Sequence, residues 1–372
     1  MLRLRSSAAL AGVAAVALLL SACGSKSNDN NSSAPPGTQS AGGGSSTPAG
    51  NALKACMVLD TGGVDDKSFN QSSWAGMQAA KQANPNIDIS YVPSNSGNDY
   101  TPNLNAEVNK GCDPVIAVGG LMFDNVKKAA KANSSVHFAE VDAPSTGPNV
   151  YGIQFNTAQG AFLGGYLAAG MTHTGTVATW GGLNIPPVTI YMDGFWEGVQ
   201  YYNHQNHKSV KVLGWDETKP KAGTFSQSFT DQNKGKQISE TFINQGADII
   251  FPVAGGAGLG SAAAAQAHNG DVSVIWVDTD GCVSAAQYCK YFMTSVLKNL
   301  TGSVTEYMQK AASGTFPTGS YIGTLDNNGT GLADYHDFAS KVPSDLQDQL
   351  DQVKQGIIAG SIKIKSPSQP AA

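Results

Sequence analysis

The chain has 372 residues, which is enough for two ordinary domains. It contains 41% hydrophobic and 14% charged residues, as expected for a globular protein with a sparsely charged surface. The formal net charge of -5 argues against a nucleic-acid partner held by phosphate contacts. Arginine occurs only as Arg3 and Arg5, so a phosphorylated or free-carboxylate ligand would have to be bound without a guanidinium fork.

The first residues predict export and lipid anchoring. Residues 1–22 carry both arginines and an apolar run, Ala8–Leu20, that is too short to remain as a membrane span. The run leads into Cys23 through small residues, which resembles a bacterial lipoprotein signal with an acylated cysteine; the alternative is an ordinary secretory peptide. Residues 23–51 are predicted to be the acylated cysteine and a flexible tether, because Ser, Gly, Asn and Pro dominate them. The expected location is the extracytoplasmic face of the cell membrane.

Four further cysteines follow the tether. Outside the cytoplasm an even set favours disulfides, and we pair Cys56 with Cys112 and Cys282 with Cys289. Buried free thiols are the alternative. The spacing of the four cysteines does not fit a CxxC zinc site, and no metal site is predicted.

Short apolar runs alternate with helical patterns in the first half. The expected strands are Ala55–Asp60, Ile87–Val92, Pro114–Val118, Val136–Val141 and Val150–Phe155. The expected helices are Ser68–Gln82, Pro102–Lys110 and Met122–Ala132. This alternation is typical of parallel strands joined by right-handed helical crossovers, and it predicts a doubly wound α/β lobe.

The same alternation restarts after Asn156. The expected strands are Gly175–Trp180, Ser209–Trp215, Asp248–Val253 and Ser273–Val277. The expected helices are Ala158–Met171, Val188–Asn203, Gln232–Gln245 and Leu259–His268. Tyr291–Ala312 adds one strand and one helix, and Leu325–Gly329 resembles the turn of a hairpin.

Two similar α/β lobes predict a clamp with a ligand cleft between them, because such sheets bind ligands beyond the carboxyl ends of their strands. We expect residues 52–156 plus 279–320 in the N-terminal lobe and residues 157–278 plus 321–365 in the C-terminal lobe. A multi-strand hinge near Phe155, Asp278 and Tyr321 should join the lobes. Residues 366–372 are expected to be a disordered tail.

The predicted strand ends carry carboxylates and glycines. Asp60, Asp142 and Asp278 end or follow strands, and carboxylates there accept hydrogen bonds from adjacent hydroxyls or act as helix caps. The glycines from Gly255 to Gly260 allow close backbone approach but lack the G-K-[ST] ending of a phosphate loop.

The first predicted helix begins with two side chains of interest. Ser68 and Gln71 have the spacing of a capping box, which by itself accounts for Ser68. Phe69 in the same turn is either a stacking surface in the cleft or a core residue.

Several blocks in order resemble the basic membrane lipoprotein family, whose purine nucleoside receptors serve ABC transporters. They begin with Asp66-Lys67-Ser68-Phe69-Asn70-Gln71 and continue through Gly160–Ala168, Gly194–Gly198, Ala254–Gly256, Val277–Asp280 and Thr294–Asn299. The likeness runs from Leu53 to Ile364. It implies a type I periplasmic-binding-protein fold that holds a nucleoside between its lobes and delivers it to a permease driven by an ATPase.

The resemblance also implies roles for individual residues. Asp60 and Asp142 would bond the base, Phe69 would stack on it, and Asp278 with Lys298 would hold the ribose hydroxyls. Asn70, Trp196 and Gly255 complete the predicted ligand-binding set, with Trp196 a candidate second stacking side chain and Phe251 expected in the core. Leu121 makes one wall of the expected cleft aliphatic, where members of the family commonly carry an aromatic residue. The sequence therefore does not determine which base is bound.

Other function classes find less support. The chain lacks G-x-S-x-G and H-E-x-x-H motifs, and His204 and His207 lie in a polar segment typical of a solvated helix end. We predict no catalytic residues, no cofactor and no nucleic-acid partner, and we expect a monomer. A sugar receptor of the same fold, or a surface lipoprotein without a transported ligand, remains the alternative.

Overall fold

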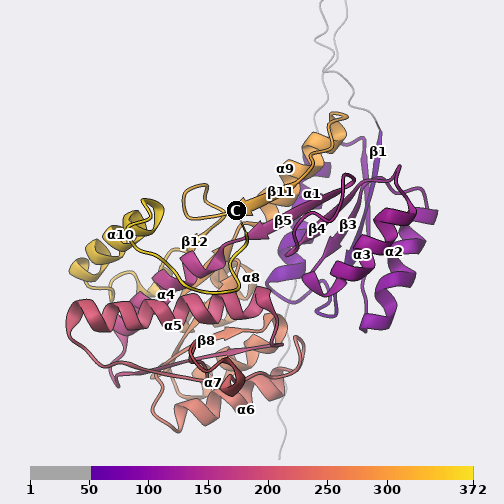
Figure 1. Cartoon of the computed structure of the whole chain (residues 1–372). Coiled ribbons are helices and arrows are strands. Elements are labelled where there is room, and N and C mark those ends of the chain that lie inside the picture. Colours follow the sequence, from indigo (N-terminus) through magenta and orange to yellow (C-terminus); the bar gives the residue numbers. More distant parts are fainter. Residues whose placement is uncertain (1–51, 372) are drawn as a thin grey trace, which may run out of the picture. The chain divides into compact units, whose positions relative to one another are not determined.

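Two six-stranded sheets organise the residues that the computed structural model describes, 52–371 (Figure 1). The predicted leader, the acylation of Cys23 and the tether lie outside the described residues. The α/β class and the two lobes expected from the alternation are confirmed.

The first sheet is entirely parallel. Its strands, in spatial order, are β11 (Ser320–Gly323), β5 (Val150–Phe155), β4 (Phe138–Val141), β3 (Val115–Val118), β1 (Leu53–Leu59) and β2 (Ile87–Val92). Its helices are α1 (Phe69–Ala83), α2 (Tyr100–Asn109), α3 (Phe123–Ala132) and α9 (Leu300–Ala312).

Helices cover both faces of this sheet, and alternate residues of β1 therefore pack into different cores. Met57 packs with side chains of α1 and α9, whereas Val58 packs with side chains of α2 and α3. A strand that is buried on both faces is apolar throughout rather than alternating, and β1 follows this pattern except at the exposed Lys54 near its start. The predicted doubly wound lobe is therefore confirmed.

The second sheet repeats this order with one antiparallel edge. Its strands are β12 (Thr330–Leu332), β10 (Phe292–Lys298), β9 (Ser273–Asp278), β8 (Ile249–Val253), β6 (Thr176–Gly181) and β7 (Lys211–Leu213). Its helices are α4 (Thr157–Met171), α5 (Pro186–Asn206), α6 (Gln232–Ile243), α7 (Leu259–Ala267), α8 (Gly281–Ser284) and α10 (Ser344–Ile358). Glycines let α4 and α5 touch: a Cβ on Gly165 would overlap the carbonyl of Phe195, and one on Gly198 that of Phe162.

The lobe boundaries differ from the expected ones in the last third of the chain. β10 pairs with β9 in the second sheet, and β11 pairs with β5 in the first. The chain therefore crosses between lobes at Asn156, at Asn299 and through residues 324–329, not near Asp278. The predicted hairpin is wrong, because the strands on either side of that turn belong to different sheets.

The expected disordered tail is also wrong for residues 366–371. Ser366 is buried, its N–H donates to Glu197 (3.0 Å), and its hydroxyl donates to Asp193 (2.6 Å). Further along, Gln369 accepts from the side chain of Asn156 at the first crossing (3.0 Å). These hydrogen bonds hold the segment against α5 and the hinge.

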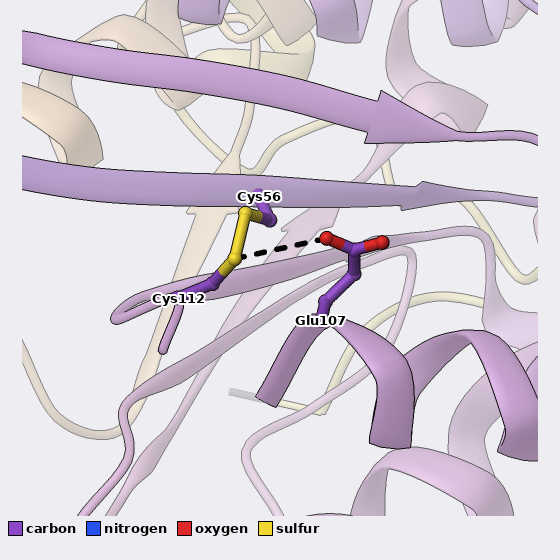
Figure 2. A group of neighbouring side chains, drawn as sticks. All are labelled: Cys56, Glu107 and Cys112. Atoms are coloured by element: carbon purple, nitrogen blue, oxygen red, sulfur yellow. Dashed lines mark hydrogen bonds between the residues drawn. A yellow bond between two sulfur atoms is a disulfide. The ribbon is translucent and has the colours of Figure 1, made fainter. Parts of the chain in front are cut away.

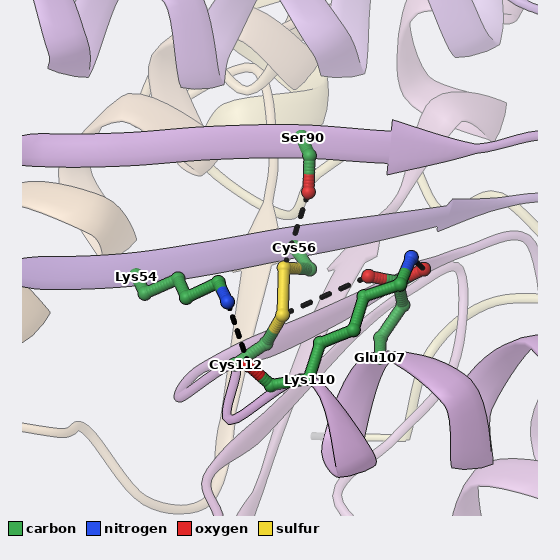
Figure 3. The surroundings of a disulfide bond; sticks show 6 residues. All are labelled: Lys54, Cys56, Ser90, Glu107, Lys110 and Cys112. Atoms are coloured by element: carbon green, nitrogen blue, oxygen red, sulfur yellow. Dashed lines mark hydrogen bonds and ion pairs between the residues drawn. A yellow bond between two sulfur atoms is a disulfide. The ribbon is translucent and has the colours of Figure 1, made fainter.

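Both predicted disulfides are present, Cys56–Cys112 and Cys282–Cys289. Figure 2 shows the buried carboxylate of Glu107 beside the first, with an oxygen 3.7 Å from the sulfur of Cys112. In Figure 3 the ammonium of Lys110 lies 2.7 Å from that carboxylate, so the buried charge is paired.

Among the described helices, none has the length and apolar character needed to cross a membrane.

Candidate functional site

A cavity lies where the carboxyl ends of the strands of both sheets face one another, and its unfilled volume, with the open solvent at its mouth included, is about 580 Å³. Seven of the eight predicted ligand-binding residues line it: Asp60, Phe69, Asn70, Asp142, Gly255, Asp278 and Lys298. These residues lie up to 238 positions apart, between Asp60 and Lys298, and the fold brings them together because parallel strands share one carboxyl edge.

The loop before α1 is organised by Asp66. Its carboxylate accepts the backbone N–H groups of Ser68 (3.1 Å), Asn70 (2.8 Å) and Gln71 (3.1 Å). The predicted capping role of Ser68 is wrong, because its hydroxyl makes no capping bond and Asp66 takes that role instead. Burial raises the pKa of Asp66 to about 7, against the three hydrogen bonds, which lower it.

Asp60 and Asn70 form a polar pair on one side of the cavity. The amide of Asn70 donates to Asp60 (2.8 Å), which also accepts the backbone N–H of Gly62 (3.0 Å). Burial raises the pKa of Asp60, while these hydrogen bonds oppose the shift. A Cβ on Gly119 would collide with this carboxylate, so the glycine ending β3 is needed for the close approach.

Lys298 forms an ion pair with Asp142 in the cavity. Its ammonium lies 2.6 Å from the Asp142 carboxylate and 4.7 Å from the centre of the Phe69 ring. Both charged groups are buried. Burial raises the pKa of Asp142, and the ammonium of Lys298 opposes that shift.

Asp278 receives two short hydrogen bonds from hydroxyl groups. Ser68 donates to one carboxylate oxygen (2.6 Å) and Tyr191 donates to the other (2.6 Å). Burial, followed by the charge of Asp278, raises the pKa of Tyr191 well above its usual value, so it remains a donor at neutral pH. Carboxylate oxygens accept more than one bond each, which leaves capacity for a ligand hydroxyl.

Asp142 and Asp278 occupy equivalent places in the two lobes. Asp142 directly follows β4 and Asp278 ends β9, the third strand in the order of each sheet, and both have a left-handed backbone (φ 68° and 66°). Aspartate tolerates this conformation better than most residues. The repeated topology therefore places one carboxylate from each lobe at the cavity.

Apolar side chains complete the walls. They are Leu121, Ile185, Pro187, Val188, Phe229, Val253, Ala254 and Val277. Gly255 has a left-handed backbone (φ 50°) with no neighbour closer than 3.8 Å to an added Cβ, so its backbone lies open to the cavity.

Trp196 is the one predicted site residue that does not line the cavity. It lies on α5, half-buried against the core of the second lobe. Phe251 is fully buried in that same core, as expected from the sequence.

Sequence reasoning missed two aromatic lining residues. Tyr191 stands five positions before Trp196 on α5, and because five residues turn a helix by about 140° beyond one full turn, the two face different directions. Phe229 lies in an irregular segment before α6, where no periodicity marks a side chain as inward-facing. It is the third aromatic side chain of the cavity wall, alongside Phe69 and Tyr191.

Two clusters of metal-ligating residue types occur among residues 52–371. One contains Cys56, Glu107 and Cys112, and the other contains Asp280, Cys282 and His336. Their cysteine sulfurs are held in disulfides and offer no thiolate, the form that binds metals. Neither cluster lines the cavity.

The cavity is thus suited to a neutral ligand with a flat face and several donors. Aromatic rings offer stacking surfaces, and three buried carboxylates offer acceptors to hydroxyl or amino groups. The single lysine is already paired, so a multiply charged anion has no cation of its own. The fold and cleft define a two-lobed solute-binding protein of the type I periplasmic-binding-protein class.

A family model described as ABC transporter substrate-binding protein PnrA-like (Bmp) matches residues 53–368, and the chain belongs to this family. It is therefore a solute-binding protein of an ABC transporter, in a family of binding proteins rather than enzymes.

Curated relatives match over most of their length. The chain is 32% identical to the CD4+ T-cell-stimulating antigen of Listeria monocytogenes, covering 84% of this chain and 88% of that one. It is 29% identical to the ABC transporter nucleoside-binding protein BmpA of Lactococcus lactis, covering 84% and 89%. The chain also resembles basic membrane protein A of Borreliella burgdorferi, at 26% identity over 84% and 88%.

Solved structures agree on the fold. An ABC transporter solute-binding protein from Aeropyrum pernix K1 superposes with a TM-score of 0.75 at 24% identity, covering 85% of this chain and 94% of that one. The glucose-galactose binding protein GanP of Geobacillus stearothermophilus gives 0.56 at 13% identity, covering 77% and 99%. These likenesses establish the two-lobed architecture and leave the ligand open.

Proposed function

We propose that this protein binds a nucleoside, with a purine base, between its lobes and delivers it to a membrane permease driven by an ATPase. The observation that carries the proposal is the cavity itself, in which Phe69 lies among the carboxylates Asp60, Asp142 and Asp278. A nucleoside presents the matching groups: a flat heterocycle with ring and amino donors, and a ribose with vicinal hydroxyls.

In this proposal each lobe contributes to one ligand. Phe69 stacks on the base while Asp60 and Asp142 accept its donors, and Asp278 accepts ribose hydroxyls. Asn70, Gly255 and Lys298 line the same cavity and complete the polar surroundings of the ligand. The Lactococcus relative supports the ligand class, since that protein is named a nucleoside-binding protein.

The structure changes one detail of the proposed mechanism. Because Lys298 is bonded to Asp142 and covers a face of Phe69, a base that stacks on that face must displace the ammonium. The ammonium must keep its ion pair with Asp142 as it moves off the ring, because a neutral nucleoside supplies no charge that could replace this carboxylate. The N–H groups that Asp142 does not use can still donate to a ligand oxygen.

We further propose that the protein acts outside the cytoplasm as a monomer, held to the membrane by acyl chains on Cys23. Metabolic labelling with a fatty-acid probe tests this, since label should enter the wild type and be absent from Cys23→Ser.

Isothermal titration calorimetry tests the ligand class. The panel contains adenosine, guanosine, inosine, cytidine, uridine, glucose, galactose and ribose. We expect one-to-one binding of at least one purine nucleoside at micromolar or tighter affinity, with monosaccharides inactive. Sugar binding without any nucleoside response would replace the proposal with the sugar-receptor alternative.

Chromatography of the same mixtures after prolonged incubation gives an independent check. The nucleosides should be recovered unchanged, because a transport receptor holds and releases its ligand. Conversion of a nucleoside to base and sugar would contradict the proposal.

A further inference from the structure

Two hydrogen bonds join the loop before α1 in the first lobe to the end of β9 in the second. The hydroxyl of Ser68 donates to Asp278 (2.6 Å), and the indole N–H of Trp276 donates to the backbone oxygen of Lys67 (3.2 Å). Ser68 and Trp276 are both 0% exposed. These bonds therefore join the two lobes at a largely buried contact beside the cavity.

The loop is built to present these two atoms to the second lobe. Lys67 has a left-handed backbone (φ 59°), which is unfavourable for lysine and persists only where surrounding bonds impose it. The carboxylate of Asp66 fixes the loop to the first turn of α1 through three backbone N–H groups. The carbonyl of Lys67 and the hydroxyl of Ser68 are thereby fixed in position on the first lobe.

The opposite surface also lies beside the loop. A Cβ on Gly256, in the turn after β8, would lie 3.8 Å from the Cα of Asp66. The second lobe thus meets the loop with a glycine turn, an indole N–H and a carboxylate. Ser68 does not cap the helix with its hydroxyl, and within residues 52–371 this hydroxyl donates across the lobes to Asp278.

We propose that Lys67 and Ser68 form a latch that couples Asp278 to closure of the lobes. Both bonds break when the lobes separate, and Asp278 then loses Ser68 while it retains Tyr191, which lies in its own lobe. A ligand bonded to Asp278 and the latch favour the same closed arrangement, so the latch adds to the lifetime of the complex. Ser68 and Trp276 are positioning residues in this account.

The inference rests on the proposed function only for the identity of the ligand used as a probe. Closure itself is measurable without any ligand. Small-angle X-ray scattering gives the radius of gyration, which increases when two lobes open about a hinge.

Ser68→Ala removes the first bond, and Ser73→Ala is its matched control. Ser73 is equally buried, but its hydroxyl donates to the backbone of Phe69 within α1 and makes no contact between lobes. We expect Ser68→Ala to raise the nucleoside dissociation rate about tenfold, with little change in the association rate, and to raise the radius of gyration of the free protein. Ser73→Ala should leave both quantities at wild-type values.

Trp276→Phe removes the second bond and keeps an aromatic ring, and Trp180→Phe is its control. The indole N–H of Trp180 donates to Ser261 inside the second lobe, and the residue is equally buried. Trp276→Phe should speed dissociation and open the free protein as Ser68→Ala does, whereas Trp180→Phe should do neither.

The proposal is overturned if Ser68→Ala and Trp276→Phe match their controls in dissociation rate and in scattering. If the wild type binds no nucleoside, the proposed function fails, and the scattering of the ligand-free variants alone decides the latch.

Discussion

Glu140 on β4 gives the sharpest prediction about stability. Its side chain is 0% exposed, and neither carboxylate oxygen has a hydrogen-bond partner among the described residues. Burial, with smaller contributions from Asp124 and Asp142, raises the pKa of Glu140 from 4.5 to about 8. The folded protein therefore keeps this group neutral at pH 7, whereas the unfolded chain ionises it.

The sign of the pH effect follows from proton binding. Between pH 4.5 and about 8 the folded state binds the proton of Glu140 and the unfolded state does not, so stability falls as pH rises. A solution at pH 7 is about 2.5 units above the pKa of Glu140 in the unfolded chain. Ionisation of the unfolded chain therefore lowers the free energy of unfolding by about 3 kcal/mol. Glutamine has the same shape and does not ionise.

Glu140→Gln should therefore raise the free energy of unfolding at pH 7 by about 3 kcal/mol, and the gain should shrink to about 1 kcal/mol or less at pH 5. Urea denaturation of both proteins from pH 5 to pH 8, extrapolated to zero denaturant, measures the difference. Glu107→Gln is the control, because Glu107 is just as buried but is paired with Lys110 (2.7 Å). A pH-independent difference for Glu140→Gln, or an equal gain for Glu107→Gln, would refute the reasoning.

Further predictions address the disulfide, the aromatic wall and the anchor. Replacing Cys56 and Cys112 together by serine should lower the free energy of unfolding by about 4 kcal/mol, read from urea curves, because the bond closes a loop with a sequence separation of 56. Phe229→Ala should weaken nucleoside binding at least tenfold in calorimetry, since the ring lines the cavity, while Trp196→Phe should leave affinity unchanged. Cys23→Ser should move the protein from the membrane fraction to the medium on an immunoblot.

The residues at the strand ends show how much of the site can be predicted from the sequence. Asp60, Asp142 and Asp278 each end or follow an apolar run, and the shared carboxyl edge of parallel strands is enough to predict that such residues meet. The alternation of strands and helices likewise predicts both lobes. What it does not specify is which sheet a late strand joins, because the residues of β10 and β11 do not identify the neighbouring strands with which they pair.

The remaining errors concern partners that are distant in sequence. Ser68 has the local spacing of a cap, yet its hydroxyl bonds a carboxylate 210 positions away. The segment around Ser366 has the polar composition of a tail, but Glu197 and Asp193 hold it from 169 and 173 positions away. Lys298 pairs with Asp142 because the lobes bring the ends of β4 and β10 together. The spacing and composition of neighbouring residues do not indicate contacts of this kind.

The central claim is that a nucleoside is held in the cleft by Asp278. The most direct test is calorimetric titration of Asp278→Asn with the purine nucleoside that binds the wild type best. Asparagine keeps the left-handed backbone (φ 66°) and the size of the side chain while it removes the charge. The account predicts at least a hundredfold loss of affinity, a larger effect than the change of about tenfold expected of Ser68→Ala. Wild-type affinity in this variant would contradict it.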